Sequence, residues 1–166
     1  MSVIEIMSKL NAKTQNYRPS MGGKADIDWE DVCGALARLP PVAQDLAFLL
    51  HNPRAGREKP RMVALLAQQT RREVEKSGLK CRKIDLQALC EGIASIALYQ
   101  VLYPNVCLTR ADRMKAGGIT MCESGYRARW ELFETRLTDY LLAVQAEIES
   151  SMIDYLRKTK RELIVA

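Results

Sequence analysis

After Gly125 the chain contains neither glycine nor proline as far as its last residue, Ala166. Apolar residues recur through this stretch at intervals of three or four positions, which is the spacing of one face of an α-helix. The stripe consists of Tyr126, Trp130, Phe133, Leu137, Leu141, Val144, Ile148, Met152 and Tyr155. It predicts one helix from about Tyr126 to Lys158, roughly 50 Å long at about 1.5 Å per residue. Two alternatives stay open for its second half: packing back on the domain, or serving as a partner-binding or dimerising arm.

The earlier part of the chain also favours helices, and no segment has the alternating pattern of a strand. Helices are expected over residues 29–39, 42–51, 60–77 and 86–103, with Asp28 and Asp85 as N-caps and Pro60 at a first helical position. The predicted fold is therefore all-α. We expect an N-terminal arm or short helix plus linker over residues 1–24, followed by one compact helical domain over residues 25–166.

A helix-turn-helix pattern occupies residues 109–133. Thr109 is placed to cap a first helix over Arg110–Ala116, and Gly117-Gly118 supplies the positive φ values of a tight helix stop. Thr120 and Glu123 form a capping-box pattern, which predicts a second helix from Met121. Its first turns carry short or basic side chains that suit a DNA major groove, namely Ser124, Arg127 and Arg129. An ordinary corner between two helices is the alternative.

Positive charge is unevenly distributed. The chain of 166 residues has a net charge of +5, and the segment from Arg54 to Lys83 holds ten Lys or Arg against three Glu. Such an excess favours nucleic acid or another polyanion through counterion release. On the predicted helix over residues 60–77 it forms a second basic surface made of Arg61, Arg71, Arg72 and Lys76.

The sequence gives little indication of a metal site, a cofactor or catalysis. The five cysteines are widely spaced without a C-x-x-C pair, and His51 is the single histidine, so neither a zinc site nor a cofactor is expected. No glycine-rich phosphate loop is present, and no apolar run approaches the ~20 residues that span a bilayer. We expect a cytoplasmic protein that is not an enzyme, with a metal-dependent nuclease as the alternative.

The pattern resembles that of the late-gene antitermination proteins of lambdoid bacteriophages, the Q-type antiterminators, in the form without a zinc finger. The resemblance covers the size, the basic helical character, the Gly118-Ile119-Thr120 turn, and the run from Tyr126 to Trp130. It implies a factor that binds double-stranded DNA near a late promoter, engages bacterial RNA polymerase with its sigma factor, and promotes read-through of terminators. It also implies action in the cytoplasm of a bacterial host cell.

Within that resemblance the candidate residues take separate roles. The helix from Met121 would read DNA together with Thr120, and Arg127 and Arg129 would contact bases or phosphates. The backbone clamps would be Arg110, Arg113 and Lys115. The second basic surface would meet a second DNA segment, nascent RNA or an acidic surface of the polymerase.

Two competing functions remain. The first is a polymerase-binding or other protein-interaction module without specific DNA binding. The second is a phage packaging or repressor subunit that binds DNA and self-associates through the long helix.

Overall fold

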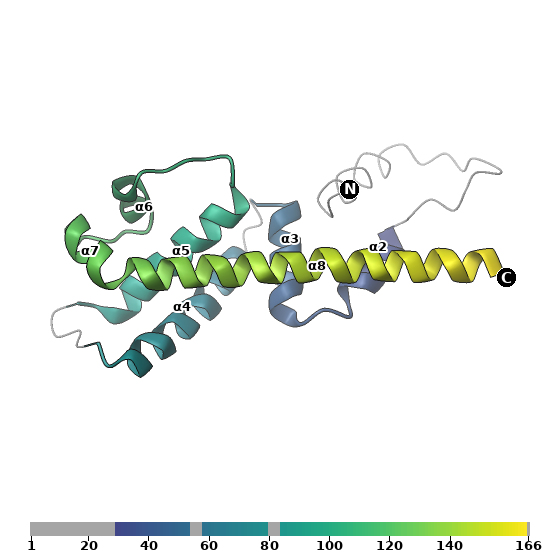
Figure 1. Cartoon of the computed structure of the whole chain (residues 1–166), viewed down its shortest axis with the longest axis horizontal. Helices are drawn as coiled ribbons and strands as arrows, with labels where there is room; N and C mark the ends of the chain where they lie inside the picture. The colour runs from purple at the N-terminus through teal and green to yellow at the C-terminus, as the bar shows by residue number, and fades with distance from the viewer. Residues whose placement is uncertain (1–28, 54–57, 80–83, 166) are drawn as a thin grey trace. The chain divides into compact units, whose positions relative to one another are not determined.

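A computed structural model describes residues 29–53, 58–79 and 84–165 of the chain (Figure 1). Within these ranges every regular element is a helix, so the expected all-α fold with a long C-terminal helix is confirmed. The helices are α2 (Trp29–Leu36), α3 (Pro41–His51), α4 (Glu58–Ser77), α5 (Leu86–Leu102), α6 (Arg110–Ala116), α7 (Glu123–Arg129) and α8 (Glu131–Val165). The predicted arm over residues 1–24 and the predicted cap Asp28 lie outside the described residues.

The chain divides into two compact units, and α8 contributes to both. One unit contains α2, α3 and the part of α8 that begins at Val144. Helix α2 approaches α8 closely at Gly34, where an added Cβ would lie 2.6 Å from the hydroxyl oxygen of Tyr155. The guanidinium of Arg38 lies 4.7 Å from the centre of the Tyr155 ring, which is cation–π distance. Glycine at position 34 thus allows α2 to approach the C-terminal part of α8.

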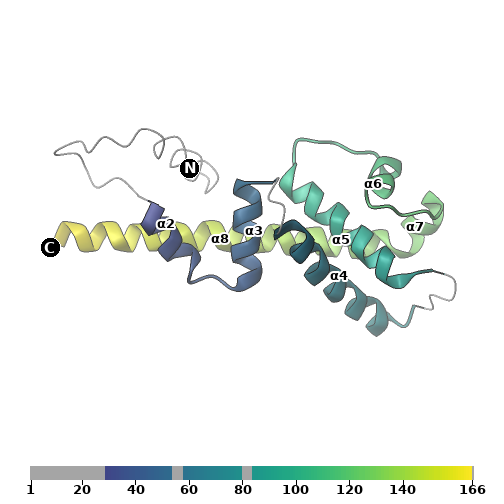
Figure 2. The ribbon, with the colours of Figure 1, turned by 180° about the vertical axis from the view of Figure 1, so that it is seen from behind.

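The other unit runs from Arg54 to Ala143 and contains α4, α5, α6, α7 and the start of α8. Helices α4 and α5 lie side by side in both views (Figures 1 and 2). Asp85 caps α5 as predicted, because its carboxylate accepts the amide hydrogens of Gln87 and Ala88. Helix α5 is the core of this unit, since its buried residues include Leu89, Cys90, Ile93, Ala97, Leu98 and Val101.

Helix α4 has one buried and one exposed side. Met62, Leu66, Ala67 and Val74 are buried, and buried Thr70 satisfies its hydroxyl by donating to the Leu66 carbonyl at 2.9 Å. The helix begins at Glu58, two residues before the predicted start at Pro60. Its opposite side carries the predicted second basic surface in an exposed position.

Candidate nucleic-acid interface

Helix α6 begins and ends as its sequence predicts. The Thr109 side chain accepts the amide hydrogen of Asp112 at 3.2 Å and so caps the first turn. At the other end the Ile119 amide donates to the Met114 carbonyl and the Gly118 amide to the Lys115 carbonyl, which is the Schellman arrangement. Gly118 adopts the left-handed conformation this motif requires, with φ of 67°. Gly117, which was expected to share that conformation, has φ of −83°.

Gly117 is required for a different reason, the close approach of α6 to α5. A Cβ on Gly117 would lie 2.8 Å from the Gly92 carbonyl oxygen, and a Cβ on Gly92 would lie 2.5 Å from the Gly117 carbonyl oxygen. Ile119 also packs on Gly92, with its Cγ1 3.0 Å from the same Cβ position. The end of α6 and the turn after it are therefore seated directly on the backbone of α5.

The predicted start of the second helix is wrong. Helix α7 begins at Glu123, not Met121, and its N-cap is Cys122, which makes no side-chain capping bond. Thr120 is exposed in the connection and does not form the predicted capping box with Glu123. The connection spans residues 117–122, longer than the roughly three or four residues of a helix-turn-helix. A helix-turn-helix is consequently not shown.

The predicted continuity from Tyr126 into the long helix is also wrong. Helix α7 ends at Arg129, and Trp130 separates it from α8, which begins at Glu131. The backbone of Trp130 has φ of −117°, far from the value of about −63° in a regular helix. No glycine or proline marks this break. Both Tyr126 and Trp130 are buried at the break, so a change of backbone direction accompanies the burial of two large aromatic side chains.

Two of the predicted DNA clamps are engaged by an acidic residue of α8. Arg110 donates two hydrogen bonds to Glu131, from Nε to Oε1 at 2.9 Å and from a terminal nitrogen to Oε2 at 3.2 Å. Arg113 donates to the same Glu131 Oε1 at 3.2 Å and to the Leu108 carbonyl at 3.5 Å. The bidentate geometry of Arg110 is the strong form of this pairing. These contacts join α6 to the start of α8.

Beneath this pairing lies a buried carboxylate. Glu134 is only 2% exposed, and its Oε1 lies 2.7 Å from the Arg113 Nε in an ion pair without the alignment of a hydrogen bond. The same carboxylate accepts the Gln100 amide at 2.8 Å and the Tyr126 hydroxyl at 2.7 Å. Thr138 completes the arrangement by donating to Gln100 Oε1 at 3.1 Å. We call these residues, together with Arg110 and Glu131, the Glu134 cluster.

The electrostatics of the Glu134 cluster follow from these partners. The hydrogen bond from Arg110 lowers the pKa of Glu131, and the charges of Arg110, Arg113 and Arg127 act in the same direction. Reciprocally, Glu131 raises the pKa of Arg110. Burial and the hydrogen bond to Glu134 raise the pKa of Tyr126 well above that of a free tyrosine. Tyr126 therefore stays neutral and remains a hydrogen-bond donor that holds α7 to α8.

The predicted contacts on α7 have the opposite environment. Ser124, Arg127 and Arg129 are exposed, while Tyr126 between them is fully buried. The inner side of α7 thus holds the helix in place and the outer side presents the basic residues. Lys115 and Thr120 are likewise exposed and line a hollow of about 380 Å³ beside the α6–α7 connection. Five of the seven predicted DNA contacts are accessible, and Arg110 and Arg113 are the two in the Glu134 cluster.

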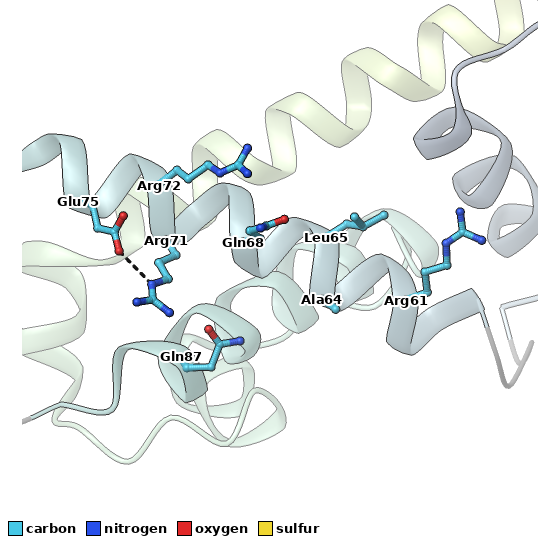
Figure 3. A pocket seen from close by; sticks show the side chains of 8 residues that line it. All are labelled: Arg61, Ala64, Leu65, Gln68, Arg71, Arg72, Glu75 and Gln87. Atoms are coloured by element: carbon cyan, nitrogen blue, oxygen red, sulfur yellow. Dashed lines mark hydrogen bonds and ion pairs between the residues drawn. The ribbon is translucent and has the colours of Figure 1, made fainter.

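The second basic surface lies along α4. Arg61, Arg71, Arg72 and Lys76 are all exposed. Arg71 donates to Glu75 at 2.9 Å in a pair spaced four residues apart on the helix. Arg61, Arg71 and Arg72 border a common groove, shown in Figure 3.

Signs of metal or thiol chemistry are few. Among the described residues no group of three or more His, Cys, Asp or Glu side chains is placed to hold a metal ion. Cys33, Cys90, Cys107 and Cys122 are not in disulfide bonds. The hydrogen bond with Ser124 lowers the pKa of the exposed Cys122. No helix in the described ranges has both the length and the apolar character needed to cross a membrane.

Comparison with known proteins found no match, either to a family model, to a curated protein or to a solved structure. A function must therefore be inferred from the residues of this chain.

The sequence analysis did not identify the acidic half of the Glu134 cluster. One signal was present: Glu134 follows Trp130 by four positions and precedes Leu141 by seven, so it falls on the buried side of a helix. An acid at such a position requires a buried partner. The partners themselves, Gln100 and Arg113, lie too far away in the sequence to be identified from spacing.

Proposed function

We propose that the protein binds double-stranded DNA through the exposed side of α7 and the adjoining end of α6. The observation that carries this proposal is the division of α7 between buried Tyr126 and exposed Ser124, Arg127 and Arg129. A helix held on one side and basic on the other can present guanidinium groups to base edges or phosphates. Lys115 and Thr120 extend the contact, while Arg110 and Arg113 position α6 through their acidic partners.

The finer proposal concerns transcription. The resemblance to Q-type antiterminators supports a factor that binds near a late promoter, engages bacterial RNA polymerase with sigma factor and promotes read-through of terminators. In this proposal the exposed basic side of α7 makes the promoter-proximal DNA contact, and no catalytic step is assigned to the protein.

DNA binding is tested by selecting fragments of the source genome with the purified protein at about physiological salt. The selected fragment then serves as the ligand in fluorescence anisotropy titrations of Arg127→Ala and Arg129→Ala. We expect each change to weaken specific binding by about 1–3 kcal/mol, the value of a good bidentate base contact. The matched control is Arg136→Ala, which removes an exposed arginine of α8 in the same unit.

The outcomes separate the competing functions. The proposal is supported if one short region is enriched and if its binding is weakened by Arg127→Ala and Arg129→Ala but not by Arg136→Ala. That result would justify a terminator read-through assay with purified polymerase. Uniform recovery of all fragments that disappears as salt rises would contradict specific recognition, because only phosphate attraction would remain. Stable oligomers in sedimentation would favour the packaging or repressor subunit.

A further inference from the structure

A partly enclosed hollow of about 210 Å³ lies where α4, α5, α6 and the connection before α6 meet. Its lining includes Lys59 from the first turn of α4, Ser95 and Tyr99 of α5, and Arg113 of α6. Ser95 and Tyr99 are four residues apart, so both side chains project from the same side of α5. All of these residues belong to the unit from Arg54 to Ala143. Polar side chains that are far apart in the sequence thus converge on one hollow.

Three of the polar groups in this lining are available to a ligand. Among the described residues, Lys59 forms no ion pair, and the hydroxyls of Ser95 and Tyr99 form no hydrogen bond. The Tyr99 ring is packed against that of Tyr103, with 4.7 Å between the ring centres, so its position is supported from within α5 and its end. An ammonium group and two hydroxyls together supply hydrogen-bond donors for a negatively charged oxygen.

Arg113 adds further donors without leaving its carboxylates. Each terminal nitrogen of a guanidinium group carries two hydrogens. One terminal nitrogen of Arg113 donates to Glu131 and the other to the Leu108 carbonyl, so each keeps a second hydrogen. The two arginines of the Glu134 cluster balance the charges of its two glutamates, and Lys59 therefore supplies an uncompensated positive charge at the hollow. A ligand with a single negative charge would complement it.

The rest of the wall is apolar. Ile96 of α5, Leu108 of the connection and Ala116 of α6 also line the hollow. Each methylene of a ligand that is buried against such a wall strengthens binding about fourfold, and inorganic phosphate has no such group. The volume is below the roughly 300–1,000 Å³ of sites for drug-sized ligands. The hollow therefore suits a small molecule with an anionic end and a short apolar body.

We propose that this hollow binds a small monocarboxylic acid with a short aliphatic chain, of about the size of butyrate. The carboxylate pairs with Lys59 and accepts hydrogen bonds from the hydroxyls of Ser95 and Tyr99. Arg113 donates a further hydrogen bond, and the aliphatic chain packs on the apolar wall. Bound in this way, the ligand joins the start of α4 to α6. The site is separate from the DNA contacts on α7 and does not depend on them.

The test titrates the isotope-labelled full chain with sodium butyrate into the millimolar range at constant ionic strength. Binding is followed by NMR through the backbone amide signals of Ser95, Tyr99 and Arg113. Three further ligands separate the parts of the proposal. Acetate tests the contribution of the aliphatic chain, butanamide tests the contribution of the charge, and inorganic phosphate tests whether any anion is sufficient.

Two variants remove the proposed contacts. Lys59→Met removes the positive charge, and Tyr99→Phe removes one hydroxyl and keeps the ring. Controls matched in type are Lys76→Met and Tyr140→Phe, which change exposed residues of the same unit. Circular dichroism confirms that every variant keeps its helical content.

Butyrate should bind saturably and shift the three amide signals. Acetate, which lacks two methylenes, and uncharged butanamide should each bind about tenfold more weakly. Lys59→Met should weaken butyrate binding about tenfold or more, and Tyr99→Phe about threefold to tenfold. The two control variants should bind butyrate as the natural chain does.

Several results would overturn the proposal. The first is the absence of saturable shifts with butyrate, and the second is equal affinity for butyrate and butanamide. Unchanged butyrate binding by Lys59→Met would contradict the assigned contact. Tighter binding of acetate or phosphate than of butyrate would show a site for anions in general, which makes no use of the apolar wall.

Discussion

The arginines of α6 and α7 have similar positions on two short helices but different environments. Arg110 and Arg113 on α6 face Glu131 and Glu134 of α8. Arg127 and Arg129 on α7 are exposed. From the sequence, all four arginines were predicted to contact DNA. The structure shows that the acids of a third helix, α8, determine which arginines are already paired within the fold.

This difference has an energetic basis. Arg113 is one-fifth exposed and lies against a carboxylate that is almost completely buried. Moving Arg113 to a phosphate would leave Glu134 buried with its charge uncompensated, which costs several kcal/mol. Arg127 and Arg129 are exposed and form no ion pair within the described residues, so binding a phosphate leaves no buried carboxylate uncompensated. We therefore expect Arg110 and Arg113 to contribute stability, and Arg127 and Arg129 to contribute DNA affinity.

The largest expected effect comes from removing the acid that distinguishes the two helices. Glu134→Ala leaves Arg113 without its nearest counter-charge and leaves Tyr126 and Gln100 without their acceptor. We expect it to lower the free energy of unfolding by about 3–5 kcal/mol, measured by urea titration. The exposed neighbour Asp139→Ala should stay within about 0.5 kcal/mol. If Glu134→Ala lowered the free energy of unfolding no more than Asp139→Ala does, the α6 arginines would have no stabilising role that sets them apart from those of α7.

A smaller effect is expected from glycine replacements, which test how closely each helix is seated. Gly92→Ala places a Cβ 2.5 Å from the backbone oxygen of Gly117, so α6 must shift, at a cost of about 1–3 kcal/mol. Gly125→Ala on α7 meets only the Cys122 sulfur at 3.1 Å and gains helix propensity. It should be neutral or stabilising by up to about 1 kcal/mol in thermal unfolding. Equal losses at both sites would contradict the seating of α6 on α5.

The smallest expected effect is on the pH dependence of stability, through the Arg110–Glu131 pair. Because Arg110 lowers the pKa of Glu131, the pair stabilises the fold above the unfolded-state pKa of about 4.3, and this contribution is lost as pH falls through the lower folded-state pKa. Between about pH 6 and pH 3 the natural chain should lose more stability than Glu131→Gln. The difference should stay below about 1 kcal/mol because the pair is partly exposed. Parallel stability profiles for the two proteins would show that the pair contributes nothing.

Local signals in the sequence predicted much of the fold. Thr109 and Asp85 cap the helices they were expected to cap, and Gly118 adopts the left-handed conformation expected after α6. Each depends on interactions within a few residues. The break at Trp130 and the start of α7 at Glu123 were missed, because no glycine, proline or side-chain cap marks them.

Less of the candidate site than of the fold could be predicted from the sequence. The exposure of Arg127 and Arg129 follows from their placement around buried Tyr126, which the apolar spacing indicates. The pairing of Arg113 with Glu134 and of Gln100 with Glu134 depends on how three helices meet. Spacing along one helix carries no information about such contacts, so the structural role of the α6 arginines required the fold.

The different roles of the α6 and α7 arginines can be measured on two double variants, Arg110→Ala with Arg113→Ala and Arg127→Ala with Arg129→Ala. Urea unfolding and DNA affinity are determined on the same preparation of each. The DNA is the fragment selected by the natural chain. We expect the α6 variant to lose several kcal/mol of stability, while its folded fraction binds DNA as the natural chain does. The α7 variant should keep its stability and lose about 1–3 kcal/mol of affinity for each arginine that makes a base contact. Unchanged DNA affinity of the α7 variant, or specific loss of affinity in an α6 variant of unaltered stability, would contradict this division of roles between the two helices.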